Sequence, residues 1–129
     1  MRTYDVAIAS LAIDAPVKWT DNVLSQYAIP GVITTQRGVA RRIPHAALLV
    51  LAVARELHEG LGLSVRDAVA MAPALLDEGA AGAHSGGHLR VVLDRSAFER
   101  DVAARLRHAL ESAPSPRRGR PPKRSIAPR

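Results

Sequence analysis

The sequence predicts a mainly α-helical protein with a small β-hairpin, a C-terminal strand–helix element and a disordered basic tail. Three observations carry this prediction. Apolar residues recur at helical spacing in several segments. Two short candidate strands flank a Gln-Arg-Gly turn. Residues 113–129 hold six basic side chains and no acidic one, which accounts for the whole formal charge of +6 and leaves residues 1–112 neutral.

The N-terminal segment predicts two short helices joined by a tight turn. Residues 6–13 are almost entirely apolar, and Asp5 can cap the helix that they form. Asp14-Ala15-Pro16 interrupts the pattern, and Pro16 suits the first turn of a second helix that runs to about Tyr27. Four apolar residues of the second helix recur at helical spacing and are expected in the core. They are Trp19, Val23, Leu24 and Tyr27.

The opposite face of this second helix is polar and is the candidate DNA-reading surface. Its side chains are of the kinds that hydrogen-bond to base edges and phosphates. A helix of this type, placed after a tight turn from a buried helix, fits the recognition helix of a helix-turn-helix. The alternative is an ordinary amphipathic helix with a solvated face. The face consists of Lys18, Asn22, Ser25 and Gln26.

A β-hairpin is predicted directly after the candidate recognition helix. Pro30-Gly31 ends the helix, and residues 32–35 and 39–43 form two short strands around a turn at Gly38. Three arginines on this hairpin are typical of a wing that contacts the DNA backbone, although each one alone would be an ordinary surface residue. They are Arg37 at the tip and Arg41 and Arg42 on the return strand.

Two stronger helices are predicted over residues 45–59 and 65–76. Ser64 is expected to cap the second of them. Pro73 lies inside that second pattern, so we expect the helix to kink or to end before it. The glycines available to end the first helix are Gly60 and Gly62.

The order of helix, turn, helix, arginine-bearing wing and helix pair resembles the MerR-type winged helix-turn-helix. The resemblance covers roughly residues 5–76 and is closest over residues 57–70, where a Gly-Leu-Ser junction precedes the last helix. It implies a DNA-binding domain over residues 1–78. It also implies that helix 16–27 reads the major groove while hairpin 32–43 contacts the backbone.

A glycine-rich stretch over residues 79–87 predicts a flexible linker. Residues 89–93 predict a strand, and residues 96–99 form a capping box for a helix that ends near Ser112. A lone strand and one amphipathic helix cannot bury themselves. Residues 88–112 must therefore pack on the first domain, pair with a second copy in a homodimer, or bind a partner protein. The helix presents one apolar stripe: Phe98, Val102, Leu106 and Leu110.

The centre of the tail, residues 117–123, resembles the AT-hook of high-mobility-group A proteins. The minor groove over A·T pairs is narrow and negative, so it attracts inserted arginines. Glycine lets the backbone approach the groove floor, and proline favours an extended chain. The alternative is a polybasic tail that binds any polyanion through counterion release. The resemblance assigns the groove to Arg118, Gly119, Arg120 and Pro121, and the phosphates to Arg117, Lys123 and Arg124.

The sequence lacks the residue patterns that catalysis requires. No glycine-rich phosphate loop or nucleophile–base arrangement is present. His84 and His88 flank a Ser-Gly-Gly stretch that disfavours a helical metal site. We therefore expect that the protein is not an enzyme and that it binds no cofactor and no metal ion. Asp5 and Asp14 interrupt the N-terminal apolar residues, so we expect no signal peptide. No apolar run is long enough to span a membrane, so we expect no membrane association. With DNA as the expected partner, we expect a cytoplasmic location at the bacterial nucleoid.

These expectations favour a DNA-binding transcriptional regulator whose partner is double-stranded DNA with A·T-rich sequence. One alternative is an antitoxin-like protein that neutralises a partner through residues 88–112 and autoregulates through DNA binding. Another is a nucleoid-associated binder of A·T-rich DNA. The expected organisation is residues 1–78, 79–87, 88–112 and 113–129.

Overall fold

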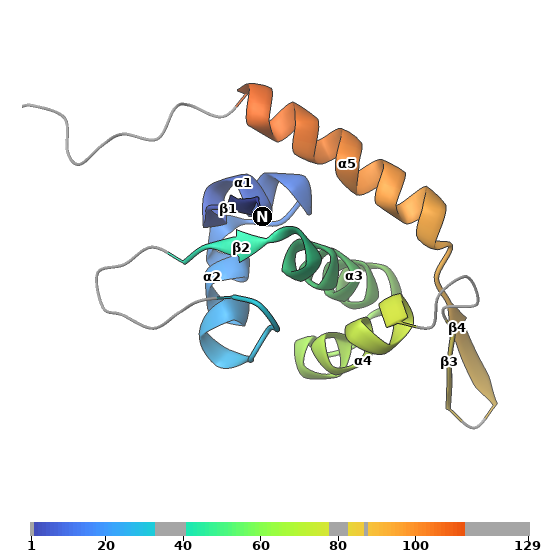
Figure 1. Ribbon diagram of the computed structural model, residues 1–129. Coiled ribbons are helices and arrows are strands. Elements are labelled where there is room, and N and C mark those ends of the chain that lie inside the picture. Colours follow the sequence, from blue (N-terminus) through green and yellow to red (C-terminus); the bar gives the residue numbers. More distant parts are fainter. Residues whose placement is uncertain (1, 33–40, 78–82, 87, 113–129) are drawn as a thin grey trace, which may run out of the picture.

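The computed structural model describes residues 2–32, 41–77, 83–86 and 88–112. Over these residues the chain is mainly helical with two small antiparallel sheets, which confirms the expected mainly α class (Figure 1). The helices are α1 (Val6–Ala12), α2 (Val17–Gln26), α3 (His45–Leu61), α4 (Val65–Asp77) and α5 (Arg95–Ser112). The strands are β1 (Thr3–Tyr4), β2 (Ile43–Pro44), β3 (Ala83–Gly86) and β4 (Leu89–Val92).

The turn between α1 and α2 follows from local chemistry. Asp5 caps α1, because its Oδ1 accepts a hydrogen bond from the backbone N–H of Ile8 at 2.8 Å. Asp14 has a φ of 57°, a left-handed conformation that aspartate tolerates better than most residues. Pro16 stands at the N-cap of α2, just before the first turn where we expected it. The two predicted helices and the turn between them are therefore present.

A short sheet joins the N-terminus to the start of α3. Tyr4 of β1 lies opposite Ile43 of β2 in an antiparallel pair. The sequence analysis did not predict β1, because two residues show no periodicity. The expected hairpin falls mostly on residues 33–40, which lie outside the described residues together with Arg37. Its described end, Ile43, pairs with the N-terminal strand.

The core is built around α3, whose residues 47–54 are buried in succession. A helix that is apolar all round belongs in the interior. Gly62 ends α3 with a φ of 74°, the left-handed cap that glycine favours. Ser64 Oγ accepts from the backbone N–H of Asp67 at 3.1 Å, which confirms the expected cap of α4.

Helix α4 continues through Pro73 to Asp77, so the expectation that it could end at Ala72 is wrong. Pro73 removes one backbone donor from the helix. Leu75 and Leu76 nevertheless lie beyond it and are buried in the core. We attribute the continuation to this packing, which outweighs the single lost hydrogen bond.

The glycine-rich stretch is not a linker throughout. Ala83–Gly86 forms β3, which pairs with β4 in the register Ala83 to Val92 and Gly86 to Leu89. A lone strand would leave its backbone groups unpaired, so the preceding segment serves as the partner of the predicted strand. Residues 78–82 and 87, the rest of the expected linker, lie outside the described residues.

Helix α5 packs along α1 and also contacts α3 (Figure 1). It begins at Arg95, and Asp94 caps it through a bond from the Ala97 N–H to Oδ1 at 3.2 Å, so the expected cap at Ser96 is wrong. Aspartate is among the residues preferred at an N-cap, where its carboxylate accepts a hydrogen bond from a backbone N–H of the first turn. The expected apolar stripe of α5 is wrong at its C-terminal end, because Leu110 is 40% exposed and Ala109 is buried in its place. The sequence left three options for α5, which were packing on its own chain, a homodimer and a partner protein. In the structure α5 packs on helices of its own chain.

Candidate nucleic-acid interface

Helix α2 presents one buried and one exposed face. Thr20, Val23 and Leu24 are buried against the core. The four side chains that the sequence analysis assigned to DNA reading are exposed on the helix surface. They are Lys18, Asn22, Ser25 and Gln26.

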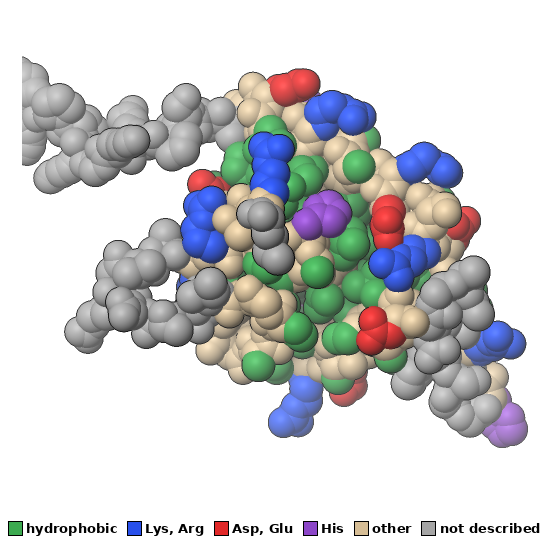
Figure 2. All heavy atoms as spheres, in the orientation of Figure 1, with side chains coloured by type: hydrophobic (Ala, Val, Ile, Leu, Met, Phe, Trp, Pro, Cys, Tyr) green, Lys and Arg blue, Asp and Glu red, His purple; other side chains and the backbone are tan. Residues whose placement is uncertain are grey.

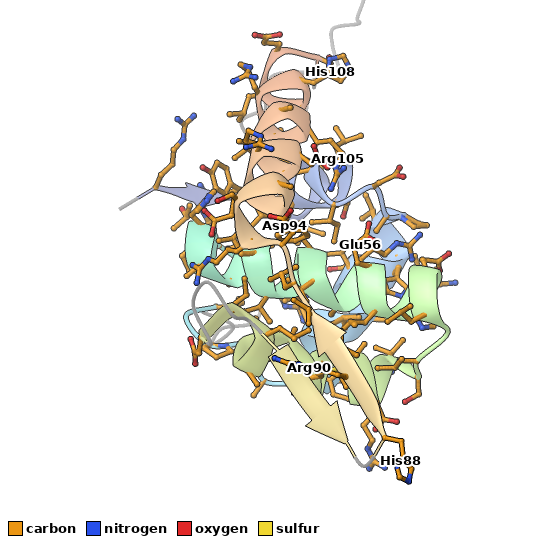
Figure 3. All side chains as sticks on the ribbon, turned by 90° about the vertical axis from the view of Figure 1, so that its right-hand side faces the viewer. Glu56, His88, Arg90, Asp94, Arg105 and His108 are labelled. Carbon is orange, nitrogen blue, oxygen red and sulfur yellow. The ribbon has the colours of Figure 1, made fainter. Side chains whose placement is uncertain are left out.

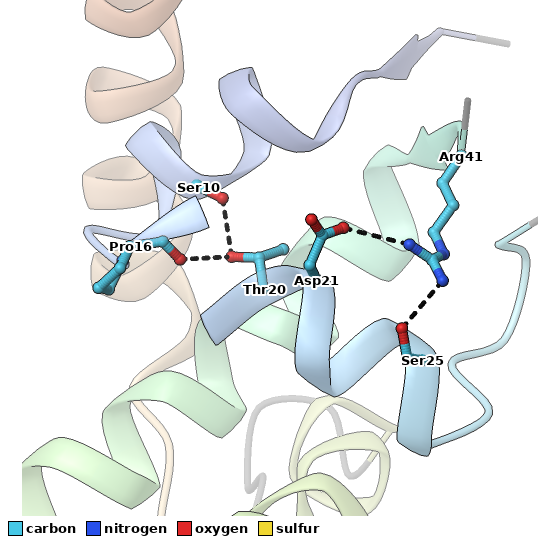
Figure 4. Close-up of polar contacts among 6 residues, drawn as sticks. All are labelled: Ser10, Pro16, Thr20, Asp21, Ser25 and Arg41. Atoms are coloured by element: carbon cyan, nitrogen blue, oxygen red, sulfur yellow. Dashed lines mark hydrogen bonds and ion pairs between the residues drawn. The ribbon is translucent and has the colours of Figure 1, made fainter. Parts of the chain in front are cut away.

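A buried pair of hydroxyl groups holds α2 against α1 (Figure 4). Ser10 Oγ donates to Thr20 Oγ1 at 2.8 Å. Thr20 Oγ1 in turn donates to the backbone carbonyl of Pro16 at 3.4 Å. Because each buried hydroxyl has a partner, the contact sets the position of α2 on α1 at little desolvation cost.

Trp19 holds the same helix against α3. The guanidinium carbon of Arg55 lies 5.0 Å from the centre of the indole ring, a cation–π distance. The ring of His58 stacks at 6.2 Å with an interplanar angle of 28°. Trp19 and Tyr27, both expected in the core, are half-buried at its edge. The Trp19 side chain therefore acts as a contact between α2 and α3.

Arg41 links the end of the predicted wing to α2 (Figure 4). Its Nη1 forms an ion pair with Asp21 Oδ1 at 3.1 Å, and its Nη2 donates to Ser25 Oγ at 3.0 Å. Two of the predicted DNA-contacting residues, Ser25 and Arg41, are therefore bonded to each other. The contact brings the chain that follows residues 33–40 beside the exposed face of α2.

Arg42 points toward the N-terminal strand. Its Nε and Nη2 donate to the hydroxyl and the carbonyl of Thr3 at 3.1 and 3.3 Å. Nearby, the guanidinium carbon of Arg2 lies 5.6 Å from the ring centre of Tyr4. The sequence did not predict the contact of Arg42 with Thr3 or that of Arg2 with Tyr4, because β1 was not predicted and its position depends on its pairing with β2.

The described part of the chain does not gather its basic side chains into one patch on the face drawn in Figure 2. Lys and Arg side chains alternate there with Asp and Glu around an apolar centre. This distribution agrees with the neutral charge of residues 1–112. The excess positive charge lies in residues 113–129, which are outside the described residues together with the AT-hook-like sequence. Those site residues are Arg117, Arg118, Gly119, Arg120, Pro121, Lys123 and Arg124.

Two further observations bear on other kinds of site. Within the described ranges, no three His, Asp or Glu side chains are close enough to hold a metal ion. Among the helices that the structure describes, none combines the length and apolar composition that a membrane span requires.

Comparison of the chain with protein-family models, with curated proteins and with solved structures finds no match.

Proposed function

We propose that this chain is a DNA-binding transcriptional regulator in which α1, α2 and residues 32–43 act as a winged helix-turn-helix. One observation carries the proposal. Lys18, Asn22 and Gln26 are exposed on one face of a helix whose other face is buried. Side chains that read bases need such a rigid support, since an orienting error of a few tenths of an ångström weakens a bidentate hydrogen bond.

The support of α2 comes from two directions. The Ser10–Thr20 hydrogen bond holds it to α1, and Trp19 packs against Arg55 of α3. The two contacts fix the orientation in which α2 presents its polar face, as base reading requires.

Affinity and selectivity are divided between two parts of the chain in this proposal. The tail, with all the excess charge, supplies the salt-dependent attraction to phosphates and the preference for A·T-rich minor grooves. Asn22 and Gln26 supply contacts to base edges, and Lys18 a contact to a phosphate. Arg41 acts as a positioning residue that keeps the predicted wing beside α2.

The experiment is a selection of duplexes from a random library with the full-length protein. Fluorescence anisotropy then compares the selected duplex with a scrambled one. We expect Asn22→Ala and Gln26→Ala each to reduce the discrimination by about 1–3 kcal/mol. Lys18→Ala should weaken binding to both duplexes by a similar factor. Arg107→Ala, which removes an exposed cation from α5, is the matched control and should leave selectivity unchanged.

The outcomes separate the proposal from its alternatives. Enrichment of A·T-rich duplexes with no common sequence would contradict base reading by α2 and favour a nucleoid-associated binder. Absence of binding to any duplex would contradict the proposal altogether. That result would also contradict the nucleoid-associated alternative and the autoregulatory part of the antitoxin-like one, and would leave partner neutralisation through residues 88–112 to be tested by itself.

A further inference from the structure

A groove lies between the C-terminal half of α3, helix α4, strand β4 and the start of α5. It encloses about 360 Å³, a volume in the range of small-molecule sites. Its floor contains the buried side chains of Leu57 and Leu75, and its walls include Leu61 and Val92, which are 59% and 60% exposed. Exposed apolar side chains around a hollow lose unfavourable contact with water when an apolar molecule fills it.

Charged side chains stand at the border of this apolar groove. Glu56 of α3 and Asp101 and Arg105 of α5 line it, and Figure 3 shows Glu56 below Arg105 between the two helices. The Arg105 guanidinium is already engaged, because its Nε donates to the carbonyl of Ala12 at the end of α1 at 2.9 Å. Within the described part of the chain, neither Glu56 nor Asp101 forms an ion pair.

A second, smaller hollow adjoins the first and shares Glu56 and Arg105 with it. It encloses about 160 Å³, and Asp14 and Glu59 also line it. The remaining cation, Arg55, is 3.3 Å from Glu59 and lies over Trp19. Four carboxylates line the two hollows against two guanidinium groups, so the lining carries a net negative charge; they are Glu56, Asp101, Asp14 and Glu59 against Arg55 and Arg105. The surroundings therefore favour a positive charge.

We infer that the groove binds a small organic cation with an apolar body. The apolar body fills the space over Leu57 and Leu75, and the ammonium group lies near the carboxylates of Glu56 and Asp101. Burial of the apolar body supplies most of the affinity, since ion pairs at a partly exposed rim contribute little. The carboxylates supply the choice of a cation over an anion. This inference does not depend on DNA binding.

The test uses two ligands with one apolar cage and opposite charges, 1-adamantylammonium and 1-adamantanecarboxylate. Each is titrated into the full-length ¹⁵N-labelled protein, and amide shifts report the site and the dissociation constant. We expect saturable shifts at residues 91–93 and Phe98 with the ammonium compound. The carboxylate should bind about fivefold more weakly or not at all, the factor expected for partly exposed charges.

Two sets of variants distinguish the groove from non-specific binding. A Cβ at Gly60 would meet only Glu56 Oε1, at 3.8 Å, so a side chain can begin there without a clash, and Gly60 lines the groove. Gly60→Leu is therefore the variant designed to fill it. We expect it to abolish the shifts. Glu56→Gln with Asp101→Asn should remove the preference for the ammonium compound. Glu111→Gln, an exposed carboxylate at the other end of α5, is the matched control and should change nothing.

Several outcomes would overturn the inference. These are equal binding of the two ligands, shifts that persist in a folded Gly60→Leu protein, and shifts confined to residues far from the groove. Concentration-dependent protection of residues 91–93 without ligand would show that a second copy occupies the groove instead. The ¹⁵N spectrum of each variant reports its folding, so loss of binding by unfolding is recognised directly.

Discussion

Ser10 Oγ donates to Thr20 Oγ1 at 2.8 Å, and this bond joins α1 to α2, the helix that presents the candidate DNA-reading surface. Among the described residues, Ser10 and Thr20 are the buried polar side chains, at 1% and 0% exposure. Without Thr20, the Ser10 hydroxyl would lack this hydrogen-bond partner. Without Ser10, the Thr20 hydroxyl would keep only its longer bond to the carbonyl of Pro16. The pair therefore specifies how α2 sits on α1.

Thr20→Val tests this pair, because valine keeps the shape of threonine but leaves the Ser10 hydroxyl buried without its acceptor. We expect a loss of about 1–3 kcal/mol in the free energy of unfolding. The single tryptophan, Trp19, makes fluorescence-detected urea unfolding a suitable measurement. Adding Ser10→Ala removes the orphaned hydroxyl and should recover part of the loss. A single variant as stable as the parent would contradict the structural role of the bond.

Trp19→Ala should destabilise the protein, because it removes the contact of α2 with Arg55 and His58 of α3. The ring is half-buried, so we expect about 2 kcal/mol, less than the value typical of a fully buried tryptophan. Urea unfolding followed by far-UV circular dichroism is the measurement. Trp19→Phe keeps an aromatic face and should lose less. An alanine variant with unchanged stability would mean that this face of α2 does not hold the helix in place.

Asp21→Asn should separate the positioning role of Arg41 from its charge. The change weakens the ion pair at 3.1 Å, in which both side chains are partly exposed, and so lowers stability by at most about 1 kcal/mol. Under the proposed function, it should tighten binding to every duplex, because a carboxylate near phosphates is removed, while discrimination between duplexes falls. Anisotropy at several salt concentrations measures both effects. Asp14→Asn is the control, because Asp14 does not contact Arg41. If it gave the same result, the effect of Asp21→Asn would come from net charge alone.

Replacing Arg118 and Arg120 with alanine should abolish the preference for A·T-rich over G·C-rich duplexes. The same change should lower the slope of log K against log salt concentration by at most about two, since each lost charge counts for at most one phosphate equivalent. Lys123→Ala with Arg124→Ala is the matched control from the same tail. It should lower the salt dependence equally and leave the A·T preference intact. Equal effects of the two double variants on A·T preference would support a generic polybasic tail over an AT-hook.

Interactions within a few residues along the chain were mostly predictable, although the cap of α5 is Asp94 and not the expected Ser96. The caps at Asp5 and Ser64 each join residues three positions apart, and the structure contains both. The exposed face of α2 also followed from periodicity, since its spacing separates Lys18, Asn22 and Gln26 from Val23 and Leu24. These features depend on backbone geometry that is the same wherever the helix lies.

Interactions between distant residues were not predictable in the same way. The contact of Arg41 with DNA stays a prediction, and its pairing with Asp21, which lies 20 positions earlier, was not predicted. Strand β3 was expected to be a linker, because small residues and glycine carry no periodic pattern. A strand with so weak a pattern is recognised only from its partner.

Local periodicity, capping residues and charge suffice for the mainly helical class, the polar face of α2 and the separation of a neutral body from a basic tail. They do so because each depends on neighbours along the chain. The destination of α5 required the tertiary structure. Its apolar stripe could have met a second copy or another protein, but Val102, Leu106 and Ala109 are buried in the chain's own core. Arg105 extends that contact to Ala12, 93 positions away, a pairing that depends on the complementary shapes of two helices.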